Sequence, residues 1–173
     1  MYMMLKSHLS FGLLAYVLLF MNSIAIPFLG TLNRPSMAAT VLFLIGLIIP
    51  DIDSQNSHVS RKVPIVHSIT NMFTRHRGFV HSIFTGILIA IGIGFLLNIN
   101  NYDLAIAGWF FIGYLIHLST DALTPHGVKP FAPFSPYTIR GPIRSGSNHE
   151  KIISLVVYSA ALLLIARNFT TLL

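Results

Sequence analysis

His117 and Asp121 are the pair of residues in this sequence whose types and spacing point most directly to chemistry. They stand four positions apart in the stretch GYLIHLSTDALTPHGV, residues 113–128, and side chains at i and i+4 lie on the same face of a helix. An imidazole and a carboxylate arranged in this way can bind one divalent cation together. The alternative is a buried histidine that hydrogen-bonds the aspartate, and the pair alone favours neither interpretation.

Two further carboxylates follow an apolar run in the stretch LIIPDIDS, residues 47–54. Pro50 ends the helix expected before them, and the i, i+2 spacing lets Asp51 and Asp53 converge on a divalent cation from a turn. Taken alone, such a pair is more often a polar helix stop than a metal site.

The stretch HRGFVHS, residues 76–82, places two histidines at the mouth of another apolar run. His81 lies just inside that run, where an unpaired imidazole would cost several kcal/mol, so it must be hydrogen-bonded, solvated or bound to a ligand. Arg75 and Arg77 are available for an anion. The alternatives are a His76 exposed in a loop and two arginines that anchor the chain at the membrane interface.

His8 and Glu150 stand near the starts of the first and the last apolar runs. Both are expected at the same membrane boundary as the residues above, so they could complete a ligand set that joins the two ends of the chain. For each residue singly the simpler interpretation is favoured. Glu150 then stabilises a helix N-terminus through the macrodipole, and His8 lies among lipid headgroups.

The elements that position these residues must be membrane helices. Of the 173 residues, 54% are hydrophobic and 9% are charged, whereas about 25% charged residues are usual in soluble domains. The chain has no cysteine, so disulfides, thiolate nucleophiles and cysteine zinc sites are excluded, and a metal must be bound by His, Asp and Glu. The net charge of +6 would suggest a nucleic-acid partner in a soluble protein, but in a membrane protein it first indicates topology, and we expect no nucleic acid.

Apolar runs predict an all-α integral membrane protein of about five transmembrane helices, forming one membrane-embedded domain over residues 1–173. The runs cover residues 9–30, 37–50, 79–99, 104–124 and 151–166. The second run reaches about 20 residues if it starts near Thr31, and otherwise forms a re-entrant segment. The turn NINNYD, residues 98–103, predicts an antiparallel hairpin of the third and fourth helices. The start of the chain is only weakly similar to a signal peptide, so we expect a retained first helix.

The basic residues predict the side of the membrane that each loop occupies. If all five runs span, the N-terminus and residues 51–78 and 125–150 share one side. Nine of the eleven Lys and Arg residues fall on it: Lys6, Arg61, Lys62, Arg75, Arg77, Lys129, Arg140, Arg144 and Lys151. The positive-inside rule makes this the cytoplasmic side of a prokaryotic plasma membrane. Every histidine and every acidic residue except Asp103 falls there too, so the metal-ligand residues should cluster at this membrane face.

In this order, the segments resemble the YdjM-like family of predicted membrane-bound metal-dependent hydrolases. The resemblance rests on SH at residues 7–8, PDID at 50–53, HRGFVHS, GYLIHLSTDALTPHGV and IRSGSNHE at 143–150, and covers most of the chain. It implies metal-ligand roles for His8, Asp51, Asp53, His76, His81, His117, Asp121 and Glu150, with His126 and Ser82 nearby. His58, His67 and His149 match no part of the pattern and are expected outside the ligand set. Ser54 and Val80 stand where the family often has His and Thr, and the missing His puts a third metal in doubt.

We therefore expect a metal-dependent hydrolase that acts on a phosphoester of a lipid or membrane-associated substrate at the inner leaflet. A similarity to zinc-dependent phospholipase C sites suggests this reaction class. Mixed imidazole and carboxylate ligands suit two zinc or manganese ions, which supply a metal-activated water. Arg75 and Arg77 would offset phosphate charge, and His126 or an unligated carboxylate would protonate the leaving group.

Two other function classes stay open. In a metal or cation transporter, polar residues should continue across the bilayer, and the outer halves of these helices carry almost none. In a non-catalytic membrane protein, the metal would only tie helix ends together.

Overall fold

Five α-helices make up most of the fold. The computed structural model describes residues 5–21, 25–26, 30–31, 36–53 and 80–171. Within these residues the helices are α1 (Leu5–Met21), α2 (Met37–Ile48), α4 (Ile83–Ile99), α5 (Ala105–Ala122) and α6 (Asn148–Thr171). A 3-10 helix η1 (Ile49–Asp53) follows α2, and two-residue strands β1 (Ala25–Ile26) and β2 (Gly30–Thr31) pair antiparallel. The prediction of an all-α chain with five helices is confirmed in this part of the chain, apart from the short strand pair.

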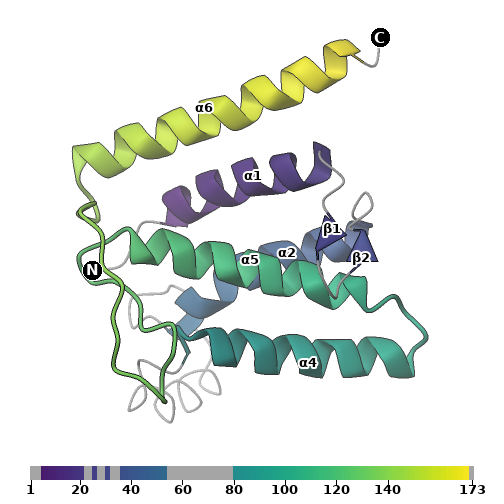
Figure 1. Cartoon of the computed structure of the whole chain (residues 1–173). Coiled ribbons are helices and arrows are strands. Elements are labelled where there is room, and N and C mark those ends of the chain that lie inside the picture. The colour runs from purple at the N-terminus through teal and green to yellow at the C-terminus, as the bar shows by residue number, and fades with distance from the viewer. Residues whose placement is uncertain (1–4, 22–24, 27–29, 32–35, 54–79, 172–173) are drawn as a thin grey trace, which may run out of the picture.

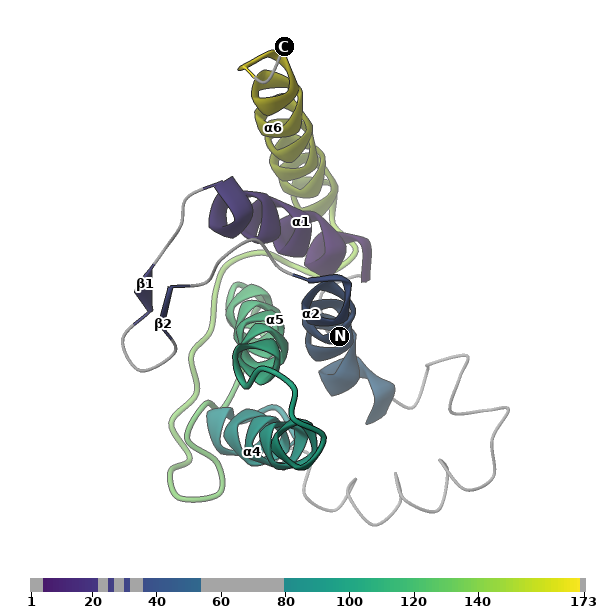
Figure 2. The ribbon, with the colours of Figure 1, turned by 90° about the vertical axis from the view of Figure 1, so that its right-hand side faces the viewer.

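The helices run alternately up and down, so their polar ends meet. Figure 1 shows α1, α4 and α6 beginning at the end of the molecule where α2 and α5 finish. Figure 2, turned by 90°, shows the layers in order: α6, then α1, then α2 beside α5, then α4. The predicted α4–α5 hairpin is confirmed. Its turn is closed by the Tyr102 amide, which donates to the Leu97 carbonyl at 2.9 Å.

The second helix is shorter than the extended span considered from the sequence. It begins at Met37 rather than near Thr31, because the Ser36 hydroxyl accepts a hydrogen bond from the Ala39 amide and so caps the helix. Thr31 lies instead opposite Ala25 in the strand pair. Twelve residues of α-helix extend about 18 Å, which is less than the ~30 Å hydrocarbon core of a bilayer.

Two glycines let α2 and α5 cross in very close contact. A Cβ atom built at Gly46 would overlap the carbonyl oxygen of Phe110, and one built at Gly113 would overlap the carbonyl oxygen of Phe43. Small residues at such crossings are typical of membrane helices, whose association depends on close van der Waals packing. The close crossing therefore determines how far the end of α2, which is followed by Asp51, lies from His117 and Asp121 on α5.

The outer surface of the helices is strongly apolar. On α6, the large side chains of Ile152, Leu155, Val156 and Leu163 are each at least 60% exposed, and α4 presents a similar row. Among the described residues, one helix segment, Asn148–Arg167, is long and apolar enough to cross a membrane by length and composition. Five ionisable side chains lie in the interior instead: His8, His81, His117, Asp121 and Glu150. This distribution is typical of a helix bundle surrounded by lipid.

The segment between α5 and α6 folds back over the polar end of the bundle. The Gly141 and Ile143 amides donate to the carbonyls of Thr124 and Leu123 at 2.9 and 3.0 Å, next to the end of α5. The Pro130 carbonyl accepts from the Ile83 amide at 2.9 Å, at the start of α4. The segment therefore ties α5 to α4 beside the residues described next.

Candidate metal centre

Five ligand-type side chains from four parts of the chain converge at the polar end of the bundle. They are His8 on α1, Asp51 in η1, His81 just before α4, and His117 and Asp121 on α5. His8, His117 and Asp121 are fully buried, His81 is 5% exposed, and the side chain of Asp51 is 21% exposed. The predicted convergence of helix ends thus brings these five residues together.

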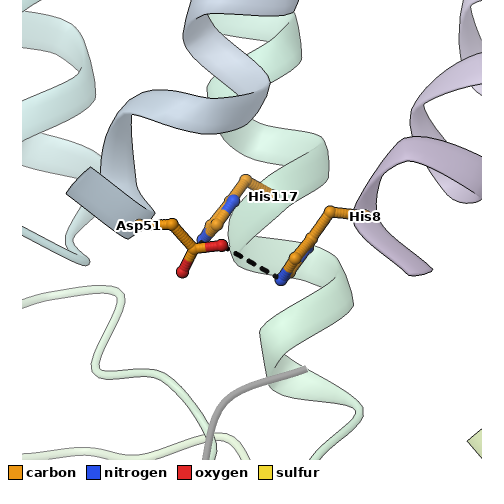
Figure 3. Close-up of side chains that lie close together, drawn as sticks. All are labelled: His8, Asp51 and His117. Atoms are coloured by element: carbon orange, nitrogen blue, oxygen red, sulfur yellow. Dashed lines mark ion pairs between the residues drawn. The ribbon is translucent and has the colours of Figure 1, made fainter. Parts of the chain in front are cut away.

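Figure 3 shows how His8, Asp51 and His117 face one another. The two imidazole rings stack, with centroids 4.1 Å apart and planes inclined by 8°. Asp51 Oδ2 lies 3.9 Å from His8 Nε2, and Asp51 Oδ1 lies 3.8 Å from His117 Nε2. The Asp51 carboxylate therefore faces the Nε2 atoms of two histidines from different helices, one with each oxygen.

Asp121 faces the same nitrogens from α5. Its Oδ1 lies 3.4 Å from His8 Nε2, and its Oδ2 lies 3.4 Å from His117 Nε2 and 3.7 Å from His81 Nε2. The helical i, i+4 spacing of His117 and Asp121 produces the predicted pairing on one face. The two oxygens of Asp121 point to different histidines.

The orientation of His117 follows from its contact with α2. Its Nδ1 lies 2.8 Å from the Leu47 carbonyl oxygen, which can only accept, so Nδ1 carries a proton. In the neutral ring, Nε2 is then unprotonated and directs its lone pair at the aspartates. The close α2–α5 crossing at Gly46 and Gly113 brings this carbonyl within reach.

Thr120 orients His8 in the same way. The Thr120 hydroxyl donates to the His117 carbonyl at 2.7 Å, so toward His8 Nδ1 it can act only as an acceptor. His8 Nδ1 therefore donates to Thr120, and Nε2 of the neutral ring is again the unprotonated nitrogen. Two imidazoles are thus held with their lone pairs turned inward.

This arrangement places hydrogen-bond acceptors opposite acceptors. His8 Nε2, His117 Nε2 and both oxygens of Asp121 are buried and make no hydrogen bond within the described part of the chain. Buried acceptors without a donor are costly, and a cation shared among them removes the cost. In a tetrahedral zinc site with bonds of about 2.0–2.1 Å, the ligand atoms lie about 3.4 Å apart. The nitrogen–oxygen separations here are 3.4 Å for the Asp121 pairs and 3.8–3.9 Å for the Asp51 pairs, so the Asp121 oxygens lie at the spacing of such ligands and the Asp51 oxygens slightly beyond it.

His81 adds a third imidazole, just before the first turn of α4. The residue is 5% exposed, and the neutral form of an imidazole is the one that binds metals. Its ring centroid lies 5.7 Å from that of His117. His81 thus extends the cluster on the Asp121 side.

The ligand atoms form two overlapping groups that could each hold a metal ion. One group is His8, Asp51 and His117, and the other is His81, His117 and Asp121, with the atoms of each group within 4.8 Å of one another. His117 is common to both. Each group offers three ligand atoms, and the two groups meet at this histidine.

Glu150 lies outside these groups. It is fully buried at the start of α6, where its carboxylate accepts hydrogen bonds from the Ser7 hydroxyl at 2.7 Å and from the Gly146 amide. Ser154 in turn donates to the Ser7 oxygen at 2.8 Å. In this structure Glu150 thus joins the ends of α1 and α6.

Several other residues singled out from the sequence are not part of the cluster or lie outside the described residues. His126 and His149 are exposed, and neither belongs to the two groups. Asp53 ends η1, but its side chain lies outside the described part of the chain. The same holds for the whole of residues His58, His67, Arg75, His76 and Arg77.

Sequence reasoning missed the residues that aim the histidines. Thr120 contacts His8 across 112 positions, and Leu47 contacts His117 across 70. Every residue has a backbone carbonyl, so the sequence cannot show that the one of Leu47 contacts a histidine. Threonine is common in helices, so Thr120 does not stand out either. The glycines in the apolar runs were the available hint that α2 and α5 cross closely.

The sequence profile of the YdjM inner membrane protein family matches residues 3–172. An uncharacterized protein of Bacillus subtilis, YvsG, is 32% identical over 111 residues, which are 63% of this chain and 66% of that protein. The inner membrane protein YdjM of Escherichia coli is 28% identical over 127 residues, 66% of this chain and 60% of that protein. The matches thus span less than two thirds of these relatives. No solved structure is significantly similar to the chain.

Proposed function

Since this chain belongs to the YdjM inner membrane protein family, we propose that it is a membrane-bound, metal-dependent hydrolase that cleaves a phosphoester of a lipid or membrane-associated substrate. The observation that carries the proposal is the pair of inward-facing nitrogens, Nε2 of His8 and of His117, held opposite Asp51 and Asp121. Such a buried set of imidazoles and carboxylates suits zinc or manganese.

His8, Asp51, His81, His117 and Asp121 are the residues that would hold one or two such ions. When bound, the metal lowers the pKa of a coordinated water to about 7 and polarises a phosphoryl oxygen. The chain itself keeps the ligands in place: hydrogen bonds at Nδ1 fix the tautomers of His8 and His117, and such partners commonly tune affinity and activity.

The partial exposure of Asp51 supports a catalytic site over a purely structural one. Structural zinc sites are closed by four protein ligands, whereas catalytic sites keep one position open to water or substrate. Here the histidines and Asp121 are buried, while 21% of the Asp51 side chain is exposed. Access from the side of η1 would admit a substrate headgroup.

The remaining roles in the proposal come from residues near the cluster in sequence. Arg75 and Arg77 would offset the charge of the phosphate, because arginine binds phosphate through paired hydrogen bonds. His126, exposed just after α5, would protonate the leaving group. On the positive-inside argument, all these groups face the cytoplasm.

The distribution of polar side chains supports a one-sided site over a cation path. Away from the cluster, the contact region of α2 and α5 is filled by Ala39, Phe43 and Trp109, which are at most 2% exposed. A path for ions would need polar groups there. A transporter is therefore the weaker candidate for the described helices.

The direct test combines metal analysis with a hydrolysis screen. The full chain, purified in detergent, should contain zinc or manganese, release phosphate or a phosphorylated headgroup from membrane lipids, lose activity with chelator and regain it when metal is restored. His117→Ala should abolish both metal binding and activity, whereas His149→Ala, an exposed histidine at the same membrane face, should change neither. A stoichiometric metal without turnover of any lipid phosphoester would favour a structural role instead.

A further inference from the structure

An apolar cavity of about 520 Å³ lies between α1 and α2 beside the metal centre, and Tyr158 of α6 also lines it. The walls include Lys6, Leu9, Leu13 and Tyr16 from α1, and Phe43 and Leu47 from α2. Each set recurs every three or four residues, so the cavity follows one face of each helix.

The length and polarity of the cavity match one lipid acyl chain. From Lys6 to Tyr16, α1 rises about 15 Å, which is half of the ~30 Å hydrocarbon core and so corresponds to one leaflet. At the far end the Tyr16 hydroxyl hydrogen-bonds the Thr40 hydroxyl at 2.7 Å. Because the two hydroxyls hydrogen-bond each other, this end of the cavity can contact an acyl chain without leaving a polar group unpaired.

The other end of the cavity adjoins the site and carries two lysines and one carboxylate. A second cavity of about 300 Å³ shares Lys6, Ser10 and Tyr158 with the first and adds Ser7, Lys151 and Glu150. The Glu150 carboxylate already accepts hydrogen bonds from Ser7 and Gly146, which leaves the lysines to bind an anion. Two lysines, both exposed, therefore flank the entrance at the end of α1 that carries His8. An anionic headgroup complements this charge, and a zwitterionic one does so less well.

The cavity and the metal centre share a wall. The side chain of Leu47 lines the cavity, while its carbonyl oxygen accepts the hydrogen bond from His117 Nδ1. We infer that the cavity holds one acyl chain of an anionic phospholipid, with its headgroup between Lys6 and the metal centre. The further step, that this lipid is the substrate, rests on the proposed function.

The fluorescence of Trp109, the single tryptophan, can serve as a probe of ligands in the cavity. Trp109 is 2% exposed, and its ring packs against Tyr16 and Phe43 with centroids 5.8 and 6.2 Å away. Both neighbours line the cavity. Phosphatidylglycerol with brominated acyl chains, titrated into the metal-loaded protein in detergent, should quench Trp109 saturably, because bromine quenches indole fluorescence only at short range.

Matched leucine variants test where the chain binds. Leu13→Phe and Leu44→Phe fill the cavity from opposite walls and should weaken quenching about tenfold or more. Leu88→Phe makes the same change on a residue that is 63% exposed on α4 and should leave quenching unchanged. Lys6→Gln should reduce the preference for phosphatidylglycerol over phosphatidylcholine about fivefold, whereas Lys129→Gln should not. Quenching that is absent, or equal in all three leucine variants, would overturn the inference.

Hydrolysis separates this inference from the proposed function. With long-chain phosphatidylglycerol, Leu13→Phe should raise KM, while a water-soluble short-chain ester with the same headgroup should be cleaved as by the wild type. Equal loss on both substrates would overturn the assignment of the bound lipid as substrate. Saturable quenching without any hydrolysis would leave the acyl-chain site standing and refute the hydrolase.

Discussion

Gly113→Ala tests whether the close crossing of α2 and α5 builds the metal centre. A Cβ atom at this position would overlap the Phe43 carbonyl oxygen and lie 3.0 Å from its carbon. The oxygen is the nearer atom, and since a carbon and a non-bonded oxygen stay at least about 3.3 Å apart, the two backbones must separate by about 1 Å. Backbone atoms cannot rotate out of the way as a side chain can, so the helices themselves have to move.

The movement has consequences for both stability and the site. Overpacking of this kind costs about 1–3 kcal/mol, which lowers the melting temperature by about 2–12 °C in a chain of this size. It also separates Asp51, which follows α2, from His117 and Asp121 by more than the roughly 0.2 Å that metal sites tolerate. We therefore expect a loss of metal affinity and a fall in any hydrolytic activity of about 100-fold.

Thermal unfolding in detergent and zinc stoichiometry are the measurements, with Gly92→Ala as the control. Gly92 lies inside α4 and a Cβ atom there would meet nothing within 4 Å, so the same change should stabilise the helix by about 0.5–1 kcal/mol. Gly46→Ala, which clashes with Phe110 from the other side of the crossing, should behave like Gly113→Ala. If Gly113→Ala melts and binds zinc as Gly92→Ala does, the reasoning is refuted.

Three other predictions address single residues and topology. Asp121→Asn keeps the size of the side chain but removes its charge, so metal content and hydrolysis should both fall. The fall should exceed the roughly 10–100-fold loss that is typical when a residue only hydrogen-bonds a metal ligand. Full metal occupancy would reject the role of Asp121 as a ligand. Glu150→Gln should weaken the contact with Ser7 by about 1–3 kcal/mol in thermal unfolding and leave metal content unchanged; loss of metal would instead identify Glu150 as a ligand. Reporter fusions should place residues 51–78 in the cytoplasm and the C-terminus outside, and an outside signal from that loop would contradict the shared face.

The number and alternation of the helices were predictable because hydropathy depends mainly on local composition. The run over residues 37–50 also predicted the start of α2 at Met37. The end of α1 was not predictable, since the apolar run continues to residue 30 whereas the helix ends at Met21 and the strand pair follows. Hydropathy measures the preference for lipid and carries little information on where a backbone turns.

The candidate site was predictable in its ligand types and less so in its geometry. His117 and Asp121 could be paired from helical spacing, and the common membrane face brought in His8, Asp51 and His81. The separate position of Glu150 could not be derived, because a glutamate at a helix start has the same sequence pattern whether it accepts from Ser7 or binds a metal. That choice depends on how α6 packs against α1.

The contact between His8 and Thr120 joins residues 112 positions apart, so the order of synthesis matters. The helix with His8 is synthesised long before α5. Membrane helices insert individually and associate afterwards, so the five clustered side chains come together only at this second stage. On the proposed function, we therefore expect a metal to bind after the helices have inserted and associated. A chain that ends before Asp121 should have no assembled centre. Its unassembled helices should be degraded by membrane proteases.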